Sequence, residues 1–339
     1  MSEPLRVGVL GAARISDASL LRPAAELGVR LVAVATRDRG RSEAYAQQHG
    51  IERVHDSYAD VIADPEVEAV YNPLPNSAHA PWNLAAIAAG KHVLTEKPAA
   101  SNAAQARQVH DAAQGTGLLT VLEGFHYRYH PQFDRLAGLV AGQEIGDFQR
   151  LDVTMLMPAP GDDDLRWSWP LSGGAMMDLG CYCLHVIRSV SRLLGGEPTL
   201  IGATATERVG RPQLDETFEV GLQLADGTPA YAHVDMDAPH NDMSIKVTGS
   251  QGTAVFADFV HPQDDDRLTL TVDGTEHIEA LDHRSTYTYQ LEAFVAAVRE
   301  GKPFPTTTAD SVATMELIDA CYESAGLLPR GTGLTGGAA

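Results

Sequence analysis

Two short stretches of this sequence carry side chains that could exchange a proton with a small molecule. The first is Glu96-Lys97-Pro98, which ends the apolar run His92–Thr95. Proline cannot donate to a strand ladder and favours an extended backbone in the residue before it, so we expect a buried strand to end here with Lys97 facing a crevice. Lysine is scarce in this chain, which favours a site for Lys97. A surface lysine at the entrance of a loop is the alternative.

The second stretch is Ser172–Arg188, in which Gly173-Gly174 precede a nearly all-apolar segment. Asp178, Tyr182 and His185 are spaced so that they fall on one face of a helix. A carboxylate, a phenol and an imidazole on such a face could bind hydroxyl groups and exchange their protons. The structural alternative is an internal hydrogen-bond network among the three, because an unpaired buried polar group costs about 1–3 kcal/mol.

A dinucleotide-binding motif follows the β-rich run Leu5–Leu10. The Rossmann fingerprint requires glycines for a tight turn, for close approach of the pyrophosphate and for helix packing. This chain has Gly11, Ala13 and Ser16 at those positions, so only the turn glycine is strict. A helical segment and the strand Arg30–Thr36 complete the strand–helix–strand unit that the motif needs. For the motif by itself, any strand-to-helix turn of an α/β protein is the alternative.

The end of that second strand distinguishes two cofactors. An NAD site places an acidic residue there for the ribose 2′-hydroxyl, whereas an NADP site uses small polar residues and arginine for the 2′-phosphate. Here Thr36 is followed by Arg37, which can stack on adenine or bind phosphate through its fork of N–H groups. We therefore predict NADP as the cofactor. NAD is the alternative, because Asp38 lies next to Arg37.

Strands and short-looped helices alternate up to residue 125, which predicts an α/β Rossmann domain with a doubly wound parallel sheet. Ligands of such sheets bind at the carboxyl ends of the strands. Gly11, Thr36, the loop Pro73–His79 and Lys97 all lie at predicted strand ends. This convergence, rather than any single motif, predicts the site. We also expect Asn76 or Ser77 to cap the helix after that loop.

After residue 125 the pattern changes to segments with period-two alternation, which predicts an α+β domain with an open, mostly antiparallel sheet. The segments are Phe148–Met157, Leu200–Thr206, Phe218–Leu224, Ala230–Asp237, Ser244–Thr248, Ala254–Ala257 and Leu268–Val272. Two predicted helices, Ala175–Leu194 and Ala309–Ala325, flank them. We predict a dinucleotide-binding domain over residues 1–125, a substrate-binding and oligomerisation domain over 126–328, and a disordered tail over 329–339.

The charge balance argues against a nucleic-acid partner, which would need a basic face, because the net charge is -20. Cys181, Cys183 and Cys321 have neither disulfide-framework nor zinc-site spacing, which indicates a reducing compartment. The sequence shows no signal peptide and no apolar run near the ~20 residues of a membrane span, so we expect a cytoplasmic protein without membrane contact. The histidines form no metal-binding motif, and we predict no metal.

Six segments are similar to motifs of one enzyme family. They are Gly11–Ile15, Asn72–His79, Gly90–Pro98, Gly124–Arg128, Gly173–Gly180 and Tyr289–Phe294. In these segments the chain resembles the GFO/IDH/MocA family of NAD(P)-dependent oxidoreductases, with coverage from about Leu5 to Gly326. The resemblance implies a Rossmann domain joined to an open sheet whose far face makes a homodimer or homotetramer. Members similar to inositol dehydrogenase carry histidine where this chain has Tyr182. A tyrosine at this position resembles the branch that contains the dimeric dihydrodiol dehydrogenases and the NADP-dependent xylose dehydrogenases.

The resemblance also implies roles for individual residues. Lys97 is the catalytic or substrate-orienting lysine, Asp178 contacts substrate hydroxyls, and Tyr182 is the acid–base residue. The residues implied for the cofactor are Gly11, Ala13, Arg14, Ile15, Thr36, Arg37, Leu74, Pro75, Asn76, His79, Glu96, Lys97 and Arg128. Those implied for the substrate are Lys97, Phe125, Trp167, Asp178 and Tyr182. Glu96 is expected to hold Lys97 or the cofactor ribose, and loops around Arg166-Trp167 and Tyr287–Tyr289 are expected to select the substrate.

The predicted reaction is hydride transfer between nicotinamide and a hydroxyl-bearing carbon of a sugar, polyol or trans-dihydrodiol. A phenol is a poor base at neutral pH, so Tyr182 needs a cation such as Lys97 to lower its pKa. A keto-sugar reductase of the anhydrofructose type is the alternative that runs the same chemistry in reverse. Glycosidic elimination and a regulatory sensor are the non-redox alternatives. The acidic charge balance favours a neutral polyol over a phosphorylated sugar.

Overall fold

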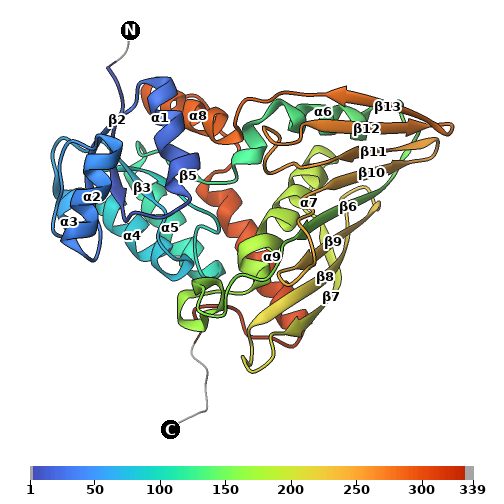
Figure 1. Cartoon of the computed structure of the whole chain (residues 1–339). Helices are drawn as coiled ribbons and strands as arrows, with labels where there is room; N and C mark the ends of the chain where they lie inside the picture. Colours follow the sequence, from blue (N-terminus) through green and yellow to red (C-terminus); the bar gives the residue numbers. More distant parts are fainter. Residues whose placement is uncertain (1–2, 333–339) are drawn as a thin grey trace.

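The computed structural model describes residues 3–332, which form two sheets with helices packed around and between them (Figure 1). A five-stranded sheet lies on one side of the molecule and an eight-stranded sheet on the other. Helices α7 (Cys181–Leu193) and α9 (Thr308–Ser324) lie between them. The predicted combination of a doubly wound parallel sheet with a mostly antiparallel sheet is confirmed.

The five-stranded sheet is entirely parallel and has the order β2-β1-β3-β4-β5. Its strands are β1 (Arg6–Leu10), β2 (Arg30–Ala35), β3 (Ala69–Asn72), β4 (His92–Thr95) and β5 (Val121–Glu123). The connecting helices are a π-helical turn (Asp17–Leu21), α1 (Arg22–Leu27), α2 (Arg39–His49), α3 (Tyr58–Ala63), α4 (Asn76–Ala88) and α5 (Ala103–Thr116). Because helices cover both faces, the strands are almost wholly buried and apolar. The strand order reverses between β1 and β3, which opens a crevice at their carboxyl ends.

The eight-stranded sheet has the order β13-β12-β11-β10-β6-β9-β8-β7, and only the β6–β9 pair is parallel. Its strands are β6 (Phe148–Leu156), β7 (Thr199–Glu207), β8 (Asp215–Gln223), β9 (Pro229–Asp235), β10 (Ile245–Gly249), β11 (Gly252–Phe256), β12 (Arg267–Val272) and β13 (Thr275–Ala280). The β13 strand was not predicted, because nearly all of its side chains are exposed and no apolar alternation marks it. Helix α6 (Pro131–Ala141) precedes the sheet.

Two helices near the C-terminus pack against the Rossmann domain. Helix α8 (Thr286–Glu300) places Leu291 and Phe294 in the same apolar cluster as Val9 of β1. Helix α9 packs on α5 as well as on β7. The expected loop around Tyr287–Tyr289 is wrong, because these residues lie inside α8. The chain thus returns to the first domain after building the second, and the boundary at residue 125 stays a prediction.

The segment that follows α9 is held in the interior by Arg330, whose side chain is 0% exposed. Its guanidinium pairs with the equally buried Asp215 and donates to the carbonyl of Gly173 at 2.7 Å. The carbonyl of Arg330 accepts from the side chain of Asn102 at 2.8 Å. The prediction of a disordered tail from residue 329 is therefore wrong for residues 329–332, because Arg330 supplies the charge that Asp215 needs. Residues 333–339 of that predicted tail lie outside the described part.

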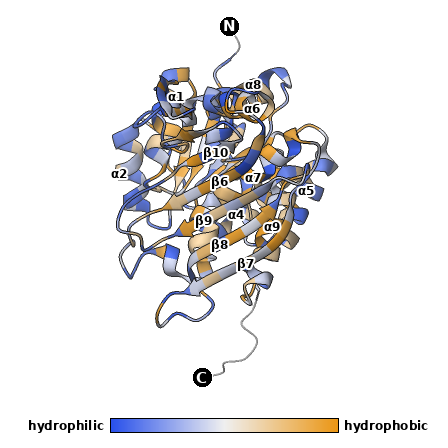
Figure 2. Cartoon of the chain, turned by 90° about the vertical axis from the view of Figure 1, so that its right-hand side faces the viewer, coloured by the Kyte–Doolittle hydropathy of each residue, from blue (hydrophilic) through white to orange (hydrophobic). Residues whose placement is uncertain are grey.

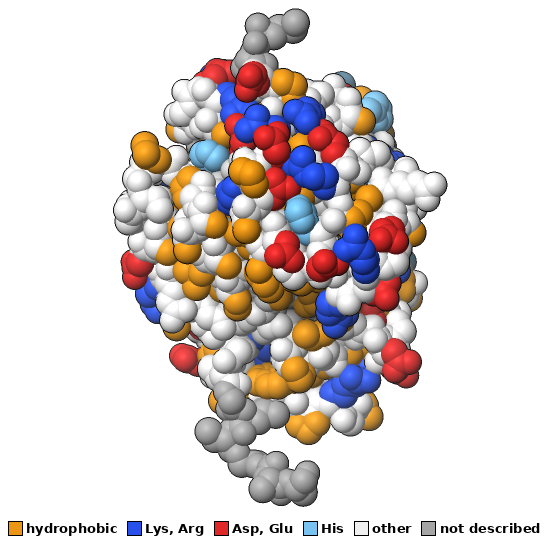
Figure 3. All heavy atoms as spheres, turned by 90° about the vertical axis from the view of Figure 1, so that its left-hand side faces the viewer, with side chains coloured by type: hydrophobic (Ala, Val, Ile, Leu, Met, Phe, Trp, Pro, Cys, Tyr) orange, Lys and Arg blue, Asp and Glu red, His pale blue; other side chains and the backbone are white. Residues whose placement is uncertain are grey.

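The surface mixes charged and apolar groups. Acidic and basic side chains lie next to one another on the side of the Rossmann domain (Figure 3), and the open face of the eight-stranded sheet mixes hydrophilic and hydrophobic residues (Figure 2). Across residues 3–332, no helix combines the length and the apolar character that crossing a membrane requires. Within the same residues, no group of three or more His, Cys, Asp or Glu side chains is arranged to hold a metal ion.

We expect Arg330→Met to lower the free energy of unfolding by about 3–5 kcal/mol, because Asp215 would keep a buried charge without its partner. Denaturant unfolding followed by circular dichroism measures this change. Arg107→Met is the control, since Arg107 joins α5 to α9 through an exposed ion pair with Glu316 and should change stability little. Equal effects of the two substitutions would contradict a special role for the buried pair.

Candidate active site

The turn after β1 forms the floor of the crevice between β1 and β3. Gly11 has φ of +94°, a conformation that favours glycine, and a Cβ there would lie 3.1 Å from Cδ2 of Leu74. Ala13 is half-buried in the same turn, while Arg14 and Ile15 are exposed. A turn of small residues fits a pyrophosphate that must approach the backbone closely.

The end of β2 combines polar and basic groups. The hydroxyl of the buried Thr36 donates to the carbonyl of Asp38 at 2.6 Å. Asp38 is occupied as the cap of α2, because its carboxylate accepts from the backbone N–H of Arg41 at 2.7 Å. Arg37 is exposed, and the guanidinium of Arg41 reaches the carbonyl of Ala12 at 2.7 Å. Two arginines therefore stand at the position where a 2′-phosphate would bind, while the nearby acid has a structural role.

The start of α4 connects the two domains. The prediction that Asn76 or Ser77 caps this helix is wrong, because α4 begins at Asn76 and no side chain makes a cap hydrogen bond. The side-chain nitrogen of Asn76 donates instead to the carbonyl of Ser172 at 2.9 Å. The hydroxyl of Ser172 donates to Ser101 at 2.8 Å, which adds a second bond between the domains. Pro75 precedes the helix, and no side chain bonds its first N–H groups. These N–H groups can therefore donate hydrogen bonds to an anionic group of a cofactor.

His79 is buried, with 1% of its surface exposed, and holds the loop after β3. Its Nδ1 lies 2.7 Å from the carbonyl of Pro98, and its Nε2 lies 2.6 Å from the carbonyl of Leu74. Burial lowers the pKa of His79 to about 4, so only one of the two nitrogens carries a proton and donates. His79 thus fixes the backbone beside Lys97, and its contact with a cofactor stays a prediction.

Glu96 is also buried, and its side chain bonds to Tyr71 rather than to Lys97. The hydroxyl of Tyr71 donates to Oε1 of Glu96 at 2.7 Å and lies against the hydroxyl of Ser19. Burial raises the pKa of Glu96 in spite of these contacts. Glu96 therefore joins β4 to β3 and to the first helical turn, and its predicted contact with the ribose is untested.

Lys97 and Asp178 come together although they lie in different domains. Nζ of Lys97 donates to the backbone carbonyl of Asp178 at 2.6 Å and lies 3.3 Å from its carboxylate. Nε of Arg166 donates to the other carboxylate oxygen at 2.6 Å. Burial opposes ionisation of Asp178, but its two cationic partners outweigh burial and lower its pKa. Burial likewise disfavours the ammonium of Lys97, but Asp178 and other neighbours raise its pKa, so Lys97 stays charged.

Backbone geometry places Asp178 in this cluster. A Cβ on Gly174 would lie 2.1 Å from Oδ1 of Asp215 and 2.8 Å from the Arg330 guanidinium, so only glycine allows this close approach. The other oxygen of Asp215 accepts from the backbone N–H of Met176 at 2.6 Å. Residues 176–180 then form a π-helical turn that carries Asp178. Such turns occur frequently at functional sites.

Tyr182 lies beside the lysine but does not hydrogen-bond to it. Nζ of Lys97 lies over the Tyr182 ring, 4.8 Å from its centroid, and the phenol hydroxyl lies 2.8 Å from Nε2 of His126. The ring also makes an edge contact with Phe125 at a centroid distance of 5.6 Å. Burial raises the pKa of Tyr182 well above its ordinary value, so the phenol keeps its proton in this structure.

The internal hydrogen-bond network among Asp178, Tyr182 and His185, which was the structural alternative, does not form. His185 turns away to Oδ2 of Asp310, at 2.8 Å, and to the hydroxyl of Tyr127, at 2.6 Å. The π-helical turn precedes Tyr182 and breaks the regular spacing on which the expected stripe rested. Each of the three side chains therefore has its own partners.

Of three other predicted residues, the structure places only Phe125 against the cluster. Phe125 is fully buried and contacts Tyr182, whereas Trp167 is 1% exposed and donates to the carbonyl of Pro160 at 3.2 Å. Arg128 lies over the ring of Phe133, 3.7 Å from its centroid. The contacts of these side chains with substrate or cofactor stay predictions.

The sequence-based list of site residues omits two side chains that the structure brings to the cluster. Arg166 binds the Asp178 carboxylate, and its side chain is 33% exposed, so it can face a ligand. His126 binds the Tyr182 hydroxyl. Both lie inside segments that the sequence singled out, but nothing in their local pattern indicates these partners.

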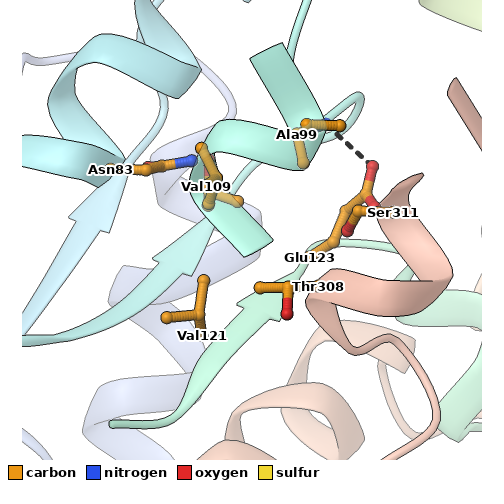
Figure 4. Close-up of a pocket in the computed structure, with 9 residues that line it drawn as sticks. Asn83, Ala99, Val109, Val121, Glu123, Thr308 and Ser311 are labelled. Atoms are coloured by element: carbon orange, nitrogen blue, oxygen red, sulfur yellow. Dashed lines mark hydrogen bonds between the residues drawn. The ribbon is translucent and has the colours of Figure 1, made fainter. Parts of the chain in front are cut away.

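Below the crevice, Glu123 supports the backbone that follows Lys97 (Figure 4). Its Oε1 accepts from the N–H of Ala99 at 2.8 Å, while its Oε2 has no hydrogen-bond partner among the described residues. Glu123 and Asn83 both line a small cavity, and the side-chain nitrogen of Asn83 also lacks a hydrogen-bond partner among the described residues. Burial raises the pKa of Glu123 to about 7.

This raised pKa predicts a pH dependence of stability. The folded state holds the Glu123 proton more tightly than the unfolded chain, so the group's stabilising contribution is complete below pH 4.5 and is lost as the pH rises through about 7. We expect the free energy of unfolding to fall over that range by up to about 3 kcal/mol in the wild type relative to Glu123→Gln, which keeps the Ala99 bond. Parallel stability curves for the two proteins would contradict the prediction.

Comparison with known proteins agrees with this geometry. Residues 5–125 match the model of the GFO/IDH/MocA oxidoreductase family with an NAD-binding Rossmann fold, and residues 133–255 match the GFO/IDH/MocA C-terminal domain. The NADP-dependent D-xylose 1-dehydrogenase 2 of Haloferax volcanii is 35% identical, over 94% of this chain and 96% of its own. The trans-1,2-dihydrobenzene-1,2-diol dehydrogenase of Sus scrofa is 31% identical, over 75% of this chain and 74% of its own.

Solved structures are similar over the whole molecule. A 3-ketoreductase from Actinomadura kijaniata, in complex with NADP and TDP-benzene, has a TM-score of 0.87 and 26% identity. The match covers 95% of this chain and 98% of that one. Both domain models and the relatives thus point to the same enzymes as the sequence motifs. The chain belongs to the GFO/IDH/MocA family of oxidoreductases.

Proposed function

We propose that this chain is an NADP-dependent oxidoreductase that acts on a hydroxyl-bearing carbon of a sugar, polyol or trans-dihydrodiol. The observation that carries the proposal is the meeting of Lys97, Asp178 and Tyr182 beside the crevice of the Rossmann domain. A charged amine, a carboxylate and a protonated phenol are the groups needed to bind a hydroxyl and to move its proton. The xylose and dihydrodiol dehydrogenases among its relatives support this substrate class.

The residues at the strand ends fit a bound dinucleotide phosphate. The Gly11 turn would hold the pyrophosphate, and Arg37 and Arg41 would hold the 2′-phosphate. Asp38, whose carboxylate would favour NAD, caps α2 instead. When bound, the oxidised nicotinamide supplies a hydride acceptor. The NADP in the related ketoreductase structure supports the same choice.

Lys97 and Tyr182 divide the proton chemistry. Lys97 orients the substrate hydroxyl and, as a cation beside the ring, favours the phenolate when the proton leaves. Tyr182 exchanges the hydroxyl proton, and Asp178 binds that hydroxyl or its neighbour. Arg166 neutralises Asp178, which leaves the ammonium of Lys97 to face the substrate.

Reduction of a keto sugar is a second candidate reaction. Burial raises the pKa of Tyr182, and the protonated phenol can donate to the alkoxide that develops in this reaction. The related 3-ketoreductase supports it as well. The same residues would serve both directions, so the direction is set by the substrate and the cofactor supplied.

The open face of the eight-stranded sheet supports a homodimer or homotetramer. Paired positions place Ile278, Val255 and Tyr231 in one row across this face, and Ile278 and Tyr231 are 51% and 41% exposed. A second copy of the chain would cover this row.

Three buried cysteines without a disulfide (Cys181, Cys183 and Cys321) support a cytoplasmic location.

We expect Arg37→Ala to raise the KM for NADP+ by about 10- to 100-fold, because a charge-assisted hydrogen bond contributes about 1.5–3 kcal/mol. The KM for NAD+ should change less than about twofold, and the wild type should prefer NADP+. Arg39→Ala is the matched control, since Arg39 lies two residues further on, at the start of α2, and is paired with Glu43 and Asp56. A clear preference of the wild type for NAD+ would overturn the cofactor assignment.

We expect both Lys97→Met and Tyr182→Phe to lower kcat by about 10²–10⁴-fold, the usual contribution of general acid–base catalysis. The phenylalanine keeps the ring below Lys97, so this variant removes only the hydroxyl. If Tyr182→Phe keeps a near-wild-type kcat while Lys97→Met loses it, the lysine alone is the base and our assignment is wrong.

A substrate panel tests the function itself. Aldoses, polyols and trans-dihydrodiols are assayed with NADP+ and NAD+, and keto sugars with the reduced cofactors. Net change in reduced-cofactor absorbance identifies the redox reaction and its direction. Product release without any net change would show elimination and would reject the proposal.

A further inference from the structure

His126 lies at the start of the short helical turn His126–Tyr129 and is completely buried. Its Nε2 is 2.8 Å from the hydroxyl of Tyr182, and its Nδ1 is 2.7 Å from the hydroxyl of Thr286 on α8. The hydroxyl of Tyr182, the imidazole of His126 and the hydroxyl of Thr286 therefore form a continuous series of hydrogen bonds.

The direction of these hydrogen bonds follows from the last member. The hydroxyl of Thr286 donates to the backbone carbonyl of Val260 at 3.3 Å, and a carbonyl can only accept. Thr286 therefore accepts from Nδ1–H of His126. A neutral imidazole then has a lone pair on Nε2, and the phenol of Tyr182 donates to it. The acceptor for the Tyr182 proton is already in place.

The surroundings keep the ring neutral and fixed. Burial lowers the pKa of His126 well below its ordinary value, and His261, Lys97 and His130 lower it further. The ring is stacked on Tyr287 of α8 at a centroid distance of 3.8 Å and an interplanar angle of 29°. This stacking holds Nε2 in line with the phenol, so the geometry does not depend on a mobile side chain.

We propose that His126 is a positioning residue that accepts the phenolic proton of Tyr182 during oxidation of the substrate, with Thr286 fixing its tautomer. This inference rests on the proposed function of Tyr182. As Tyr182 removes the proton of the substrate hydroxyl, its own proton moves to Nε2 of His126. Reduction of a carbonyl runs the same transfers in reverse.

The step balances in atoms and charge. The substrate C–H bond breaks and its electron pair leaves as hydride to the oxidised nicotinamide, while the substrate O–H bond breaks and a C=O bond forms. Tyr182 gains one proton and loses one, and His126 gains one. The oxidised nicotinamide would lose its positive charge as the imidazole gains one. The net charge of the site is therefore unchanged by the step.

The first test needs neither cofactor nor substrate. Nitrogen-15 NMR of the ¹⁵N-histidine-labelled protein, with His126→Gln used for assignment, reports the tautomer. We expect a neutral ring protonated on Nδ1, with an Nε2 shift that changes in Tyr182→Phe. A ring protonated on Nε2, or an Nε2 shift that is the same in Tyr182→Phe, would overturn the proposal.

The second test measures the single-turnover rate of hydride transfer. His126→Phe keeps the stacking on Tyr287 but cannot accept a proton, and Thr286→Val removes the acceptor of Nδ1–H. We expect each to slow the step by about 10- to 100-fold, with the KM for substrate changed less than about twofold. The rate is also measured in mixtures of H2O and D2O and plotted against the deuterium fraction. The wild-type plot should be curved, because two protons move in the step, and the His126→Phe plot should be linear.

His110→Phe is the matched control, because His110 forms the same Nδ1 contact with a threonine, Thr308, at 2.9 Å away from the cluster. It should leave the rate and the isotope dependence unchanged. If Tyr182→Phe stops turnover while Thr286→Val and a folded His126→Phe match the wild type, only the relay is wrong. If Tyr182→Phe remains active, the proposed acid–base role of Tyr182 fails first.

Discussion

Lys97 and Asp178 belong to different domains, and their partly buried ion pair links the joining of the domains to the formation of the site. Removing a charge from water is costly without a partner, and Lys97 meets this carboxylate only when the two domains are held at this distance. Arg166 adds a second cation to the same carboxylate. The carboxylate thereby has a cationic partner at each of its two oxygens.

Around this pair, the buried polar side chains are arranged as separate bonded sets. Glu96 is bonded to Tyr71, Tyr182 to His126, and His185 to Asp310. Because a buried polar group without a partner is expensive, each set fixes the orientation of its members. The orientation of Glu96 and Tyr182 near the crevice is therefore fixed by their hydrogen-bond partners.

Local pattern was enough to predict most elements of the fold. The turn at Gly11 and the abrupt strand end before Pro98 depend on neighbours in the sequence, so composition and periodicity reveal them. The partners of Asp178 and Tyr182 depend on packing between distant segments. Residue spacing does not indicate that His126 bonds to Tyr182. Nor does it indicate that Asp178 lies in a π-helical turn, which changes its position relative to Tyr182.

The segment around Arg330 and the strand β13 were also missed, because local sequence pattern does not reveal tertiary contacts. The segment around Arg330 is rich in glycine and threonine, which is typical of disorder, yet one arginine fits the charge of Asp215 in the interior. Likewise, the exposed strand β13 lacks the apolar alternation from which strands are recognised. In each case a tertiary contact outweighs the local preference.

The place of Arg330 in the chain has a consequence for biosynthesis. Asp215 and the turn at Gly174 emerge from the ribosome long before the arginine that neutralises them, and α8, which completes the Rossmann core, emerges late as well. Domains generally fold in the order of synthesis, but neither core here is complete until the last helices have been made. A nascent chain of this protein therefore exposes an unfinished interior for most of its translation, and an interrupted one cannot assemble the turn that carries Asp178.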